Sequence, residues 1–495
     1  MITEVTLDEE APTIRETHTG LVFLLGDRAY KIKKSVTFDF VDFSTRALRL
    51  AACLREVELN RRLAPDVYDG VIIVTDVHGE PADHLVAMRR MPESARLSTL
   101  VRSGVPLVEG IRGIGRLLAA FHANADRSPE ITEQGTQDAL LGRWRASLHE
   151  IASFRGTVLP AERVDEIGQL VEDFLAGRAD LFAARADAGR IVDGHGDLLA
   201  EDIFLLDDGP RILDCLEFDD RLRSLDGLDD VAFLAMDLER LGAPELRDLL
   251  LDSYAEYSGD PAPPALREHY LAYRAFVRAK VACLRYAQHD RYAAARARFD
   301  VDVALRHLRA GEVRLILVGG LPGTGKTTLA GSLADRLGAV ALSSDRIRKE
   351  NAGLPAEEHA PAPYHEGIYS PDHTEATYHD LLHRAEALLA LGETVILDAS
   401  WPSARLREQA ADAACRAHSR LVQLHCTAPT TIAEARLRAR PASMSDADAV
   451  IAAAMTATAD PWPDAIEVST ADSTDQAVVH ALAAINERPS ARSHR

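Results

Sequence analysis

Two short stretches of this 495-residue sequence combine residue types suited to phosphate chemistry. In GHGDLLAEDIFLL (194–206), Asp197 and a second carboxylate, Asp202, stand five positions apart. One could accept a proton from a hydroxyl while the other binds Mg²⁺, which is the division of roles that phosphoryl transfer needs. GGLPGTGKTT (319–328) combines closely spaced glycines with a lysine and threonines. The sequence therefore predicts two phosphoryl-transfer sites, far apart in the chain.

The glycine-rich stretch follows an apolar run and precedes an Ala/Leu-rich helical pattern, which is the setting of a Walker A loop. Glycines let backbone N–H groups approach phosphate oxygens closely. We expect Lys326 to place its charge on the β- and γ-phosphates of ATP during catalysis, and Thr327 to bind Mg²⁺. The expected nucleotide contacts are Gly320, Leu321, Pro322, Gly323, Thr324, Gly325, Lys326, Thr327 and Thr328.

The apolar run 339–345 ends at Asp345 and is followed by Arg346, Arg348 and Lys349. Ligands of open α/β folds bind at the carboxyl ends of strands, so Asp345 could accept the proton of an attacking hydroxyl. It could also cap the next helix, and the two roles are compatible. A proton acceptor here favours transfer to an acceptor over simple hydrolysis.

Three features strengthen the first stretch. Asp214 follows an apolar run in RILDCLEF and would join Asp202 in binding metal, with Asp197 as the proton acceptor. Lys31, at the end of a predicted hairpin, suits the α- and β-phosphates of ATP. Glu56, or alternatively Glu58, lies on the next predicted helix and could pair with this lysine.

Two neighbouring features have other interpretations. His195 lacks partners at metal-ligand spacing, so we expect it to brace the turn rather than react. The acidic segment 217–230 could line a pocket for a cationic amino sugar, but a solvated acidic loop is the favoured interpretation.

The elements that must position these residues differ between the two parts of the chain. A hairpin at 20–34, a helix at 45–64 and strands at 71–76 and 84–91 precede mostly helical sequence. After residue 312, apolar runs alternate with helical stretches, which predicts a parallel sheet with crossover helices. These runs are 313–320, 339–345, 394–400 and 420–427. We expect domains at 1–309 and 310–485, and a disordered tail at 486–495.

Composition limits the compartment and the partners. Five cysteines without C-x-x-C spacing favour a reducing cytoplasm. The acidic N-terminus has no apolar core typical of a signal peptide, and no apolar run approaches the ~20 residues of a membrane span. A net charge of −21 makes nucleic acid an unlikely partner and gives no indication of a protein partner.

Region 313–470 resembles the small P-loop kinases that include gluconate kinase, phage polynucleotide kinase and zeta toxins. The similar segments are LSSDRIRKE, VILDAS followed by Arg405, and the lid-like ARLRARPASMSDA (435–447). The resemblance implies that Asp345 is the general base and that Asp398 lies beside the metal. It also implies that Arg436 and Arg440 reach the transferring phosphate, although a solvated helix face is an equal alternative for both arginines.

The first part resembles the aminoglycoside phosphotransferase family, which is related to choline and fructosamine kinases. The whole chain resembles bacterial proteins known as bifunctional aminoglycoside phosphotransferase/ATP-binding proteins. The similar segments, in order, are AYKIKKSVTFDFVDFSTR, REVELNRRLAPDVY, GHGDLLAEDIF, ILDCLEF and the P-loop region. The resemblance implies α/β and α+β folds: a protein-kinase-like domain followed by a doubly wound parallel sheet.

The chain departs from this family pattern at two catalytic-loop positions. Asp202 stands where the family has Asn, and Leu199 where it has His. An aspartate still binds Mg²⁺ through oxygen, but its extra charge would repel ATP phosphates when metal is missing. A G-x-G-x-x-G loop is also absent from the first part of the sequence. The first site could therefore be impaired or purely nucleotide-sensing.

The sequence thus predicts a phosphotransferase with two ATP–Mg²⁺ sites and a small-molecule acceptor of the sugar or amino sugar class. Two alternatives stay open: catalysis by the P-loop domain alone under regulation by the other, and an ATP-hydrolysing switch that binds a partner. Nucleic acid as the acceptor is a third alternative, which the acidity of the chain disfavours.

Overall fold

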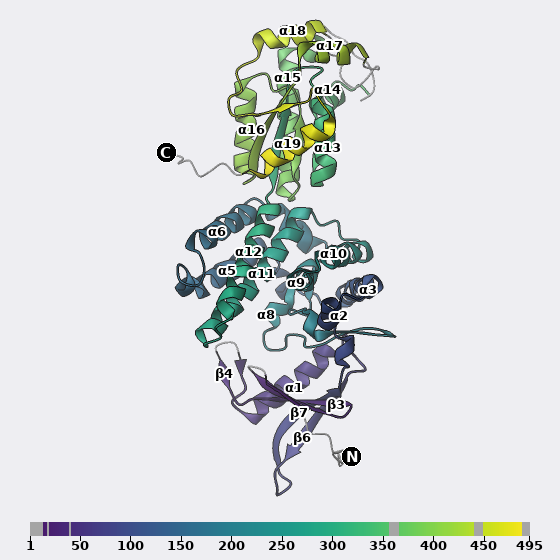
Figure 1. Ribbon diagram of the computed structural model, residues 1–495, viewed down its shortest axis with the longest axis vertical. Coiled ribbons are helices and arrows are strands. Elements are labelled where there is room, and N and C mark those ends of the chain that lie inside the picture. Colours follow the sequence, from purple (N-terminus) through teal and green to yellow (C-terminus); the bar gives the residue numbers. More distant parts are fainter. Residues whose placement is uncertain (1–12, 17–18, 39–40, 356–365, 440–448, 488–495) are drawn as a thin grey trace. The chain divides into compact units, whose positions relative to one another are not determined.

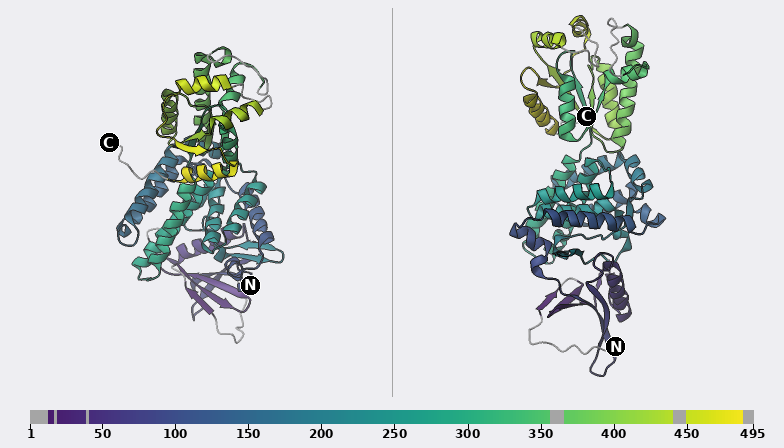
Figure 2. Two further views of the ribbon diagram at one scale, coloured as in Figure 1. Left: turned by 45° about the horizontal axis from the view of Figure 1, so that its top comes forward. Right: turned by 90° about the vertical axis from the view of Figure 1, so that its right-hand side faces the viewer.

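The computed structural model describes residues 13–16, 19–38, 41–355, 366–439 and 449–487 (Figure 1, Figure 2). The chain forms two compact units. The first unit comprises Met1–Val164, Phe182–Ala262 and His269–His307, and the second comprises Asp165–Leu181, Pro263–Glu268 and Leu308–Arg495. Most of the tail predicted at 486–495 lies outside the described residues. No helix in the described part of the chain is long and apolar enough to cross a membrane.

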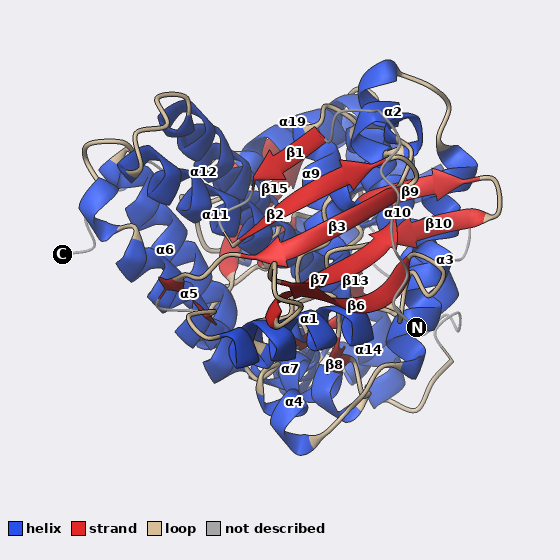
Figure 3. Ribbon diagram, turned by 90° about the horizontal axis from the view of Figure 1, so that it is seen from below, coloured by secondary structure: helices blue, strands red, loops and turns tan. Residues whose placement is uncertain are grey.

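The first unit begins with an antiparallel sheet in the order β1-β2-β3-β7-β6 (Figure 3). These strands are β1 (Thr13–Glu16), β2 (Gly20–Leu25), β3 (Arg28–Lys33), β6 (Tyr68–Thr75) and β7 (Pro81–Arg89). Gly26, at φ 55°, makes the tight turn between β2 and β3, and this confirms the hairpin predicted at 20–34. Helix α1 (Arg46–Asn60) packs on the sheet, and Cys53 and Val57 join its buried core.

The rest of the first unit is mainly helical, with two short antiparallel strand pairs that carry the catalytic-loop segment. Strand β8 (Ile191–Asp193) pairs with β11 (Ser224–Asp226), and between them in sequence β9 (Ile203–Leu206) and β10 (Gly209–Ile212) form a hairpin. The principal helices are α2 (Leu97–Ser103), α3 (Val108–Asn124), α5 (Gln137–Glu150), α9 (Gly227–Arg240) and α10 (Pro244–Ser258). Helices α6 (Ala161–Ala176), α7 (Ala179–Asp187), α11 (Pro264–Ala287) and α12 (Ala293–Ala310) contribute residues to both units.

The second unit contains a parallel sheet in the order β13-β14-β12-β15-β16. Its strands are β12 (Arg314–Gly319), β13 (Val340–Ser343), β14 (Val395–Asp398), β15 (Arg420–Thr427) and β16 (Ile466–Ser469). Helices α13 (Lys326–Leu337) and α19 (Thr474–Asn486) share a core with one face. Helices α15 (Pro371–Ala390) and α16 (Ala404–Arg416) pack with other parts of the sheet, and Figure 2 shows helices on both faces.

This topology confirms the predicted fold class, a kinase-like part followed by a doubly wound parallel sheet. The chain leaves β12 toward β13 on one side and leaves β15 toward β16 on the other. The carboxyl ends of β12 and β15 therefore form the switch point where such sheets bind ligands. The strand predicted at 339–345 is shorter than expected, because the chain enters helix α14 (Ser344–Asn351) at Ser344.

Candidate active sites

The predicted lysine–glutamate pair forms between strand β3 and helix α1. Lys31 Nζ lies 2.9 Å from Glu56 Oε1 and 2.7 Å from Asp214 Oδ1. Burial opposes the charge on Lys31, but these two carboxylates outweigh it and hold the lysine pKa well above its usual value. Glu58, the alternative partner, instead makes an exposed pair with Arg55 at 2.9 Å. The structure thus brings together three of the predicted residues.

A second lysine, which the sequence analysis did not single out, completes this cluster. Lys33 Nζ lies 2.6 Å from Glu56 Oε2 and also pairs with Glu217. The Lys33 side chain is 0% exposed, and that of Glu56 is 1% exposed. Lys31 and Lys33 lie two residues apart on a strand, so their side chains lie on the same face of the sheet. This two-residue spacing could have predicted from the sequence that both lysines belong to the cluster.

The turn before Asp197 is held by a buried carboxylate. The backbone N–H groups of His195 and Gly196 donate to Asp230 at 2.7 and 2.9 Å, and His122 Nε2 lies 3.0 Å from the same side chain. Burial alone would raise the pKa of Asp230. The hydrogen bond and charge of His122, together with the donors from the turn, instead hold the Asp230 pKa well below the usual range. His195 Nε2 lies 3.1 Å from the Leu213 carbonyl oxygen, so this histidine braces the turn as expected.

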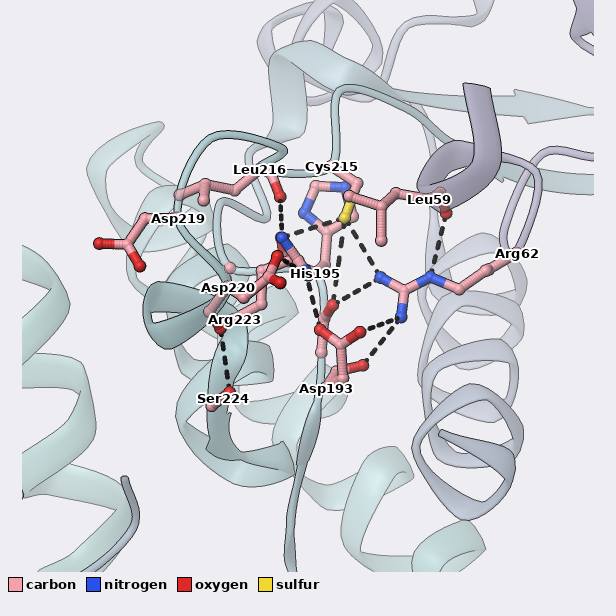
Figure 4. A network of polar contacts seen from close by, with 12 residues as sticks. Leu59, Arg62, Asp193, His195, Cys215, Leu216, Asp219, Asp220, Arg223 and Ser224 are labelled. Atoms are coloured by element: carbon pink, nitrogen blue, oxygen red, sulfur yellow. Dashed lines mark hydrogen bonds and ion pairs between the residues drawn. The ribbon is translucent and has the colours of Figure 1, made fainter. Parts of the chain in front are cut away.

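Two arginines fix the start of the catalytic loop from opposite sides (Figure 4). Arg62, just beyond α1, donates to Asp193 Oδ2 at 3.2 Å and to the Gly194 carbonyl at 2.8 Å. Arg223 Nε donates to Asp193 Oδ1 at 2.8 Å and its Nη1 to the Leu216 carbonyl, also at 2.8 Å. The backbone that leads to Asp197 is therefore tied both to α1 and to the segment that follows Asp214.

Three aspartates of the first unit influence one another. Burial raises the pKa of Asp197 to about 6. Burial and the charges of Asp214 and Asp197 raise the pKa of Asp202 well above its usual value. The charge of Lys31 holds the pKa of Asp214 below its usual value. Asp214 has a φ of 62°, a left-handed conformation uncommon outside glycine that marks functional turns.

These carboxylates suit a hard cation. Asp202 and Asp214 supply oxygen ligands, and the charges of Asp214 and Asp197 add to burial in raising the pKa of Asp202. Within the described residues, no three His, Cys, Asp or Glu side chains gather closely enough to hold a metal by themselves. Mg²⁺ commonly binds through one or two carboxylates together with substrate phosphates, so the donor set fits it.

A cavity of about 470 Å³ extends from this cluster between the sheet and the segment 202–214. Its lining combines apolar and charged side chains, as a flat base and a phosphate chain would require. The apolar lining comes from Val22, Leu24, Ala29, Met88, Met91, Phe204 and Leu213. The charged lining includes Lys31, Glu56, Asp202 and Asp214.

The acidic segment 217–230 does not behave as expected. Asp226, Asp229 and Asp230 are buried, so the solvated-loop interpretation is wrong for these three residues. Asp226 pairs with Arg185 and Asp229 with Arg274, each at 2.7 Å. Because internal arginines already neutralise Asp226 and Asp229 and His122 contacts Asp230, these three carboxylates do not offer free charge to a cationic acceptor.

In the second unit, the glycine-rich loop connects β12 to α13 as predicted. Gly320, Gly323 and Gly325 have φ values of 139°, 85° and 83°. A Cβ added at Gly320 would lie 2.6 Å from the Cys426 carbonyl oxygen, so only glycine fits there. A cavity of about 320 Å³ borders the loop and the start of α13. Its lining includes Gly323, Gly325, Lys326, Thr327, Thr328, Arg436, Leu437, Thr470 and Thr474.

Arg436, on helix α17 (Thr430–Ala439), lines the same cavity as Lys326. Its Nη2 donates to the Thr470 carbonyl at 2.6 Å, and the Thr470 hydroxyl donates to the Thr324 carbonyl at 2.6 Å. Thr470, which the sequence analysis missed, thereby ties this arginine to the loop. Arg440, the other predicted arginine, lies outside the described residues.

Two predicted acidic residues lie at the carboxyl edge of the sheet. Asp398 ends β14 and pairs in register with Val318 of β12 and Ser343 of β13. Asp345 is the second residue of α14, which begins where β13 ends. Both therefore belong to the edge from which the phosphate loop leaves β12. Arg405 instead makes an exposed pair with Glu375 at 2.8 Å.

Comparison with known proteins agrees with this division. A family model described as an AAA domain matches residues 315–461, within the second unit. The uncharacterized protein Rv2004c of Mycobacterium tuberculosis (strain ATCC 25618 / H37Rv) is 43% identical over 471 residues, 95% of each chain. The chain belongs to the family of this mycobacterial protein. The family recognised from the sequence, a kinase-like domain fused to a P-loop kinase-like domain, is confirmed.

Two solved structures that are similar to the present chain each match a part of it. A choline/ethanolamine kinase family protein from Mesorhizobium loti is 17% identical and covers 61% of this chain and 93% of its own, with a TM-score of 0.38. A gluconokinase from Sinorhizobium meliloti 1021 is 16% identical and covers 35% of this chain and 91% of its own, with a TM-score of 0.27.

Proposed function

We propose that this chain is an ATP-dependent phosphotransferase with two nucleotide sites, each of which transfers the γ-phosphate to a hydroxyl of a small sugar-class metabolite. The observation that carries the proposal is the position of Lys31, which bridges Glu56 and Asp214 in a cavity that both apolar and charged side chains line. The glycine loop with Lys326 at the head of α13 supports the second site.

In the first site, Lys31 binds the α- and β-phosphates and Glu56 holds the lysine in place. Asp202 and Asp214 hold Mg²⁺, which when bound neutralises charge on the phosphates. Asp197 accepts the acceptor's hydroxyl proton as the new P–O bond forms, and the bond to the leaving ADP oxygen breaks. Asp230 keeps the catalytic turn in position through the N–H groups of His195 and Gly196.

In the second site, the loop amides and Lys326 bind the β- and γ-phosphates. Thr327 and Asp398 hold Mg²⁺, and Asp345 accepts the proton of the acceptor hydroxyl. Arg436, fixed by Thr470, contributes positive charge at the transferring phosphate. In both sites the protein positions reactants and stabilises charge, because a loose phosphoryl transition state needs little covalent assistance.

One observation favours a second candidate, in which the first site binds nucleotide without transferring phosphate. Asp202 adds a carboxylate whose raised pKa reflects repulsion by Asp214 and Asp197 as well as burial. If the first site is regulatory, Lys326→Ala abolishes all nucleotide turnover and Asp197→Ala does not.

A phosphorylation screen of a metabolite library, followed by mass spectrometry, tests the proposal. Wild type is compared with Asp197→Ala and Lys326→Ala, and Glu58→Ala and Arg405→Ala serve as controls with exposed side chains. We expect one product to be lost in each catalytic variant and none in the controls. Turnover of ATP without any phosphorylated product would instead support the hydrolysing switch.

A further inference from the structure

Helix α11 places a buried arginine against the catalytic loop of the first unit. Arg274 is 5% exposed, and its Nε donates to Asp229 Oδ1 at 2.7 Å. Its Nη1 lies 3.5 Å from the Gly196 carbonyl oxygen, and Gly196 immediately precedes Asp197. This part of α11 is therefore fixed next to the proposed proton acceptor.

Arg278 lies one helical turn farther along α11, on the same face as Arg274. It is half-buried and makes no hydrogen bond or ion pair with any of the described residues. Its charge nevertheless acts on Asp197. Burial is the largest influence on the Asp197 pKa and raises it, and the charge of Arg278 is the second largest and lowers it. Burial also raises the pKa of Asp300, whose own ion pair is with Arg240, and the charges of Arg240 and Arg278 partly offset this rise. A cation without an ion pair of its own in the described part of the chain thus lies near the base.

The surrounding helices add positive charge. Residues 269–307, which run along α11 and α12, contain eight Arg and Lys and three Asp, in a chain of net charge −21. Four of these cations are paired with carboxylates: Arg274, Lys280, Arg296 and Arg306. The two helices lie side by side (Figure 1, Figure 3). Burial lowers the pKa of Arg285, and the charges of Arg278 and Arg296 lower it further, so Arg285 is close enough to each of these two cations for repulsion.

Nearby acids in the described part of the unit are already engaged. Asp229 pairs with Arg274. Asp237 accepts a hydrogen bond from the Ala200 N–H at 3.1 Å and pairs with Arg240 at 3.1 Å. A cationic amino sugar at Asp197 would therefore be repelled by Arg278, which has no ion pair of its own among the described residues, whereas an anion would pair with it.

We propose that the acceptor of the first site is a small anionic hydroxyl compound, a sugar-class molecule bearing phosphate or carboxylate, and that Arg278 binds its anionic group. This inference rests on the proposed function of the first site. A guanidinium suits either group, because its N–H donors match paired oxygens.

The test uses Lys326→Ala protein, so that measured transfer comes from the first site. Its kcat and KM are determined with four acceptor classes: hexoses, hexose 6-phosphates, hexonates and 2-amino-2-deoxyhexoses. We expect an anionic acceptor to have a kcat/KM at least about tenfold above that of its parent hexose. Adding Arg278→Gln is expected to reduce this preference about tenfold or more through KM, and Arg278→Lys to restore part of it. Lys280→Gln, on the same helix but paired with Glu150, keeps the preference.

Other results overturn the inference. Preference for the amino sugar, or an equal kcat/KM for the anionic acceptors and the parent hexose, would do so. An equal loss of kcat in every class on Arg278→Gln would show that the arginine acts on the transferring phosphate instead. Absence of Asp197-dependent transfer to every class would reject the proposed function of the first site itself.

A binding measurement keeps the two failures apart. Inorganic phosphate is titrated calorimetrically into Lys326→Ala protein saturated with Mg²⁺ and AMP-PNP. We expect binding that Arg278→Gln weakens at least tenfold and that Lys280→Gln leaves unchanged. If phosphate does not bind, or binds equally well to all three proteins, Arg278 is not an anion site, whatever the transfer assay shows.

Discussion

At neutral pH, a carboxylate serves as a proton acceptor when its pKa lies slightly below the working pH, and Asp197 meets this condition. Burial raises the pKa of Asp197 to about 6, so the fraction in the basic form increases as the pH rises through this value. We expect kcat/KM of the first site to increase from pH 5 to a plateau above pH 7, measured in Lys326→Ala protein.

The same profile tests the neighbours of Asp197. Because the charge of Arg278 lowers the Asp197 pKa, Arg278→Gln should move the acidic limb to higher pH. Asp197→Asn should reduce kcat by about 10²–10⁴-fold across the whole range. An acidic limb that persists in the residual activity of Asp197→Asn would assign the titration to another group.

Asp202 is the residue where this chain departs most from a kinase-like site, and it should destabilise the metal-free protein. The pKa of Asp202 is higher in the folded state than in the unfolded state, where it is about 3.9. The protein is therefore most stable, as far as Asp202 is concerned, below the unfolded-state pKa, and it loses this stability as the pH rises toward the folded-state pKa. Asn cannot ionise. We therefore expect Asp202→Asn to raise the Tm at pH 8 without Mg²⁺ by about 2–4 °C, equivalent to about 1 kcal/mol.

Thermal unfolding at pH 5 and pH 8, with and without Mg²⁺, measures this effect. The gain should shrink at pH 5 and when Mg²⁺ binds the native carboxylates. Glu201→Gln, which changes an exposed neighbour, should leave the Tm within 1 °C by the usual magnitude of surface substitutions, about 0.5 kcal/mol or less. A decrease in Tm for Asp202→Asn at pH 8 would contradict the proposed repulsion.

Among the elements, β3, α1 and the segment around Asp214 are joined through Lys33. This lysine pairs with Glu56 of α1 and with Glu217, and its side chain is fully buried. Lys33→Met leaves Glu217 without this partner, so we expect a loss of about 3–5 kcal/mol in the free energy of unfolding by urea. Lys34→Met, which removes a more exposed pair with Glu16, should cost at most about 1 kcal/mol. Equal effects of the two substitutions would contradict the proposed role of Lys33.

The phosphate loop offers a matched pair of glycine substitutions. A Cβ at Gly320 would meet the Cys426 carbonyl, so Gly320→Ala should displace the loop and weaken nucleotide binding at least about tenfold. A Cβ added at Gly331, inside α13, would enter open space, so Gly331→Ala should keep the affinity and stabilise the helix by about 0.5–1 kcal/mol. Calorimetric titration with Mg²⁺ and AMP-PNP in a Lys31→Ala background measures both variants. Unchanged affinity in Gly320→Ala would mean that the loop tolerates the displacement.

Elements with strong apolar patterns were predictable from the sequence, and those that bury charge were not. Strands β12, β14 and β15 and the hairpin β2–β3 follow their apolar runs closely. Helix α9 buries Asp229 and Asp230. Its sequence alone indicates a solvated segment, because the partners that allow these aspartates to be buried, Arg274 and His122, belong to other helices. These partners lie 45 and 108 residues away along the chain, a pairing that local spacing cannot reveal. Strand β16 is four residues long and mostly exposed, which leaves little pattern to detect.

For the molecule as a whole, net charge is a poor guide to the acceptor. The value of −21 argues against non-specific binding to nucleic acid. Yet residues 269–307 contain more basic than acidic residues, Arg278 has no ion pair of its own among the described residues, and two aspartates of segment 217–230 are neutralised internally. Salt should therefore weaken binding of an anionic acceptor even though the protein is acidic, because screening acts on the local charges.

The proposal of two nucleotide sites predicts that each chain binds two equivalents of nucleotide, and a titration can measure this number. Each proposed site has its own lysine, Lys31 in the first unit and Lys326 in the second. We expect calorimetric titration with Mg²⁺ and AMP-PNP to give about two equivalents bound to wild type, about one to each of Lys31→Ala and Lys326→Ala, and none to the double variant. If the sites are independent, the affinity of the remaining site equals its wild-type value. A shift in that affinity would measure a coupling free energy between the sites, and it must be the same in both directions. One equivalent in wild type, lost entirely in Lys326→Ala, would leave the first unit without a nucleotide and reject the two-site proposal.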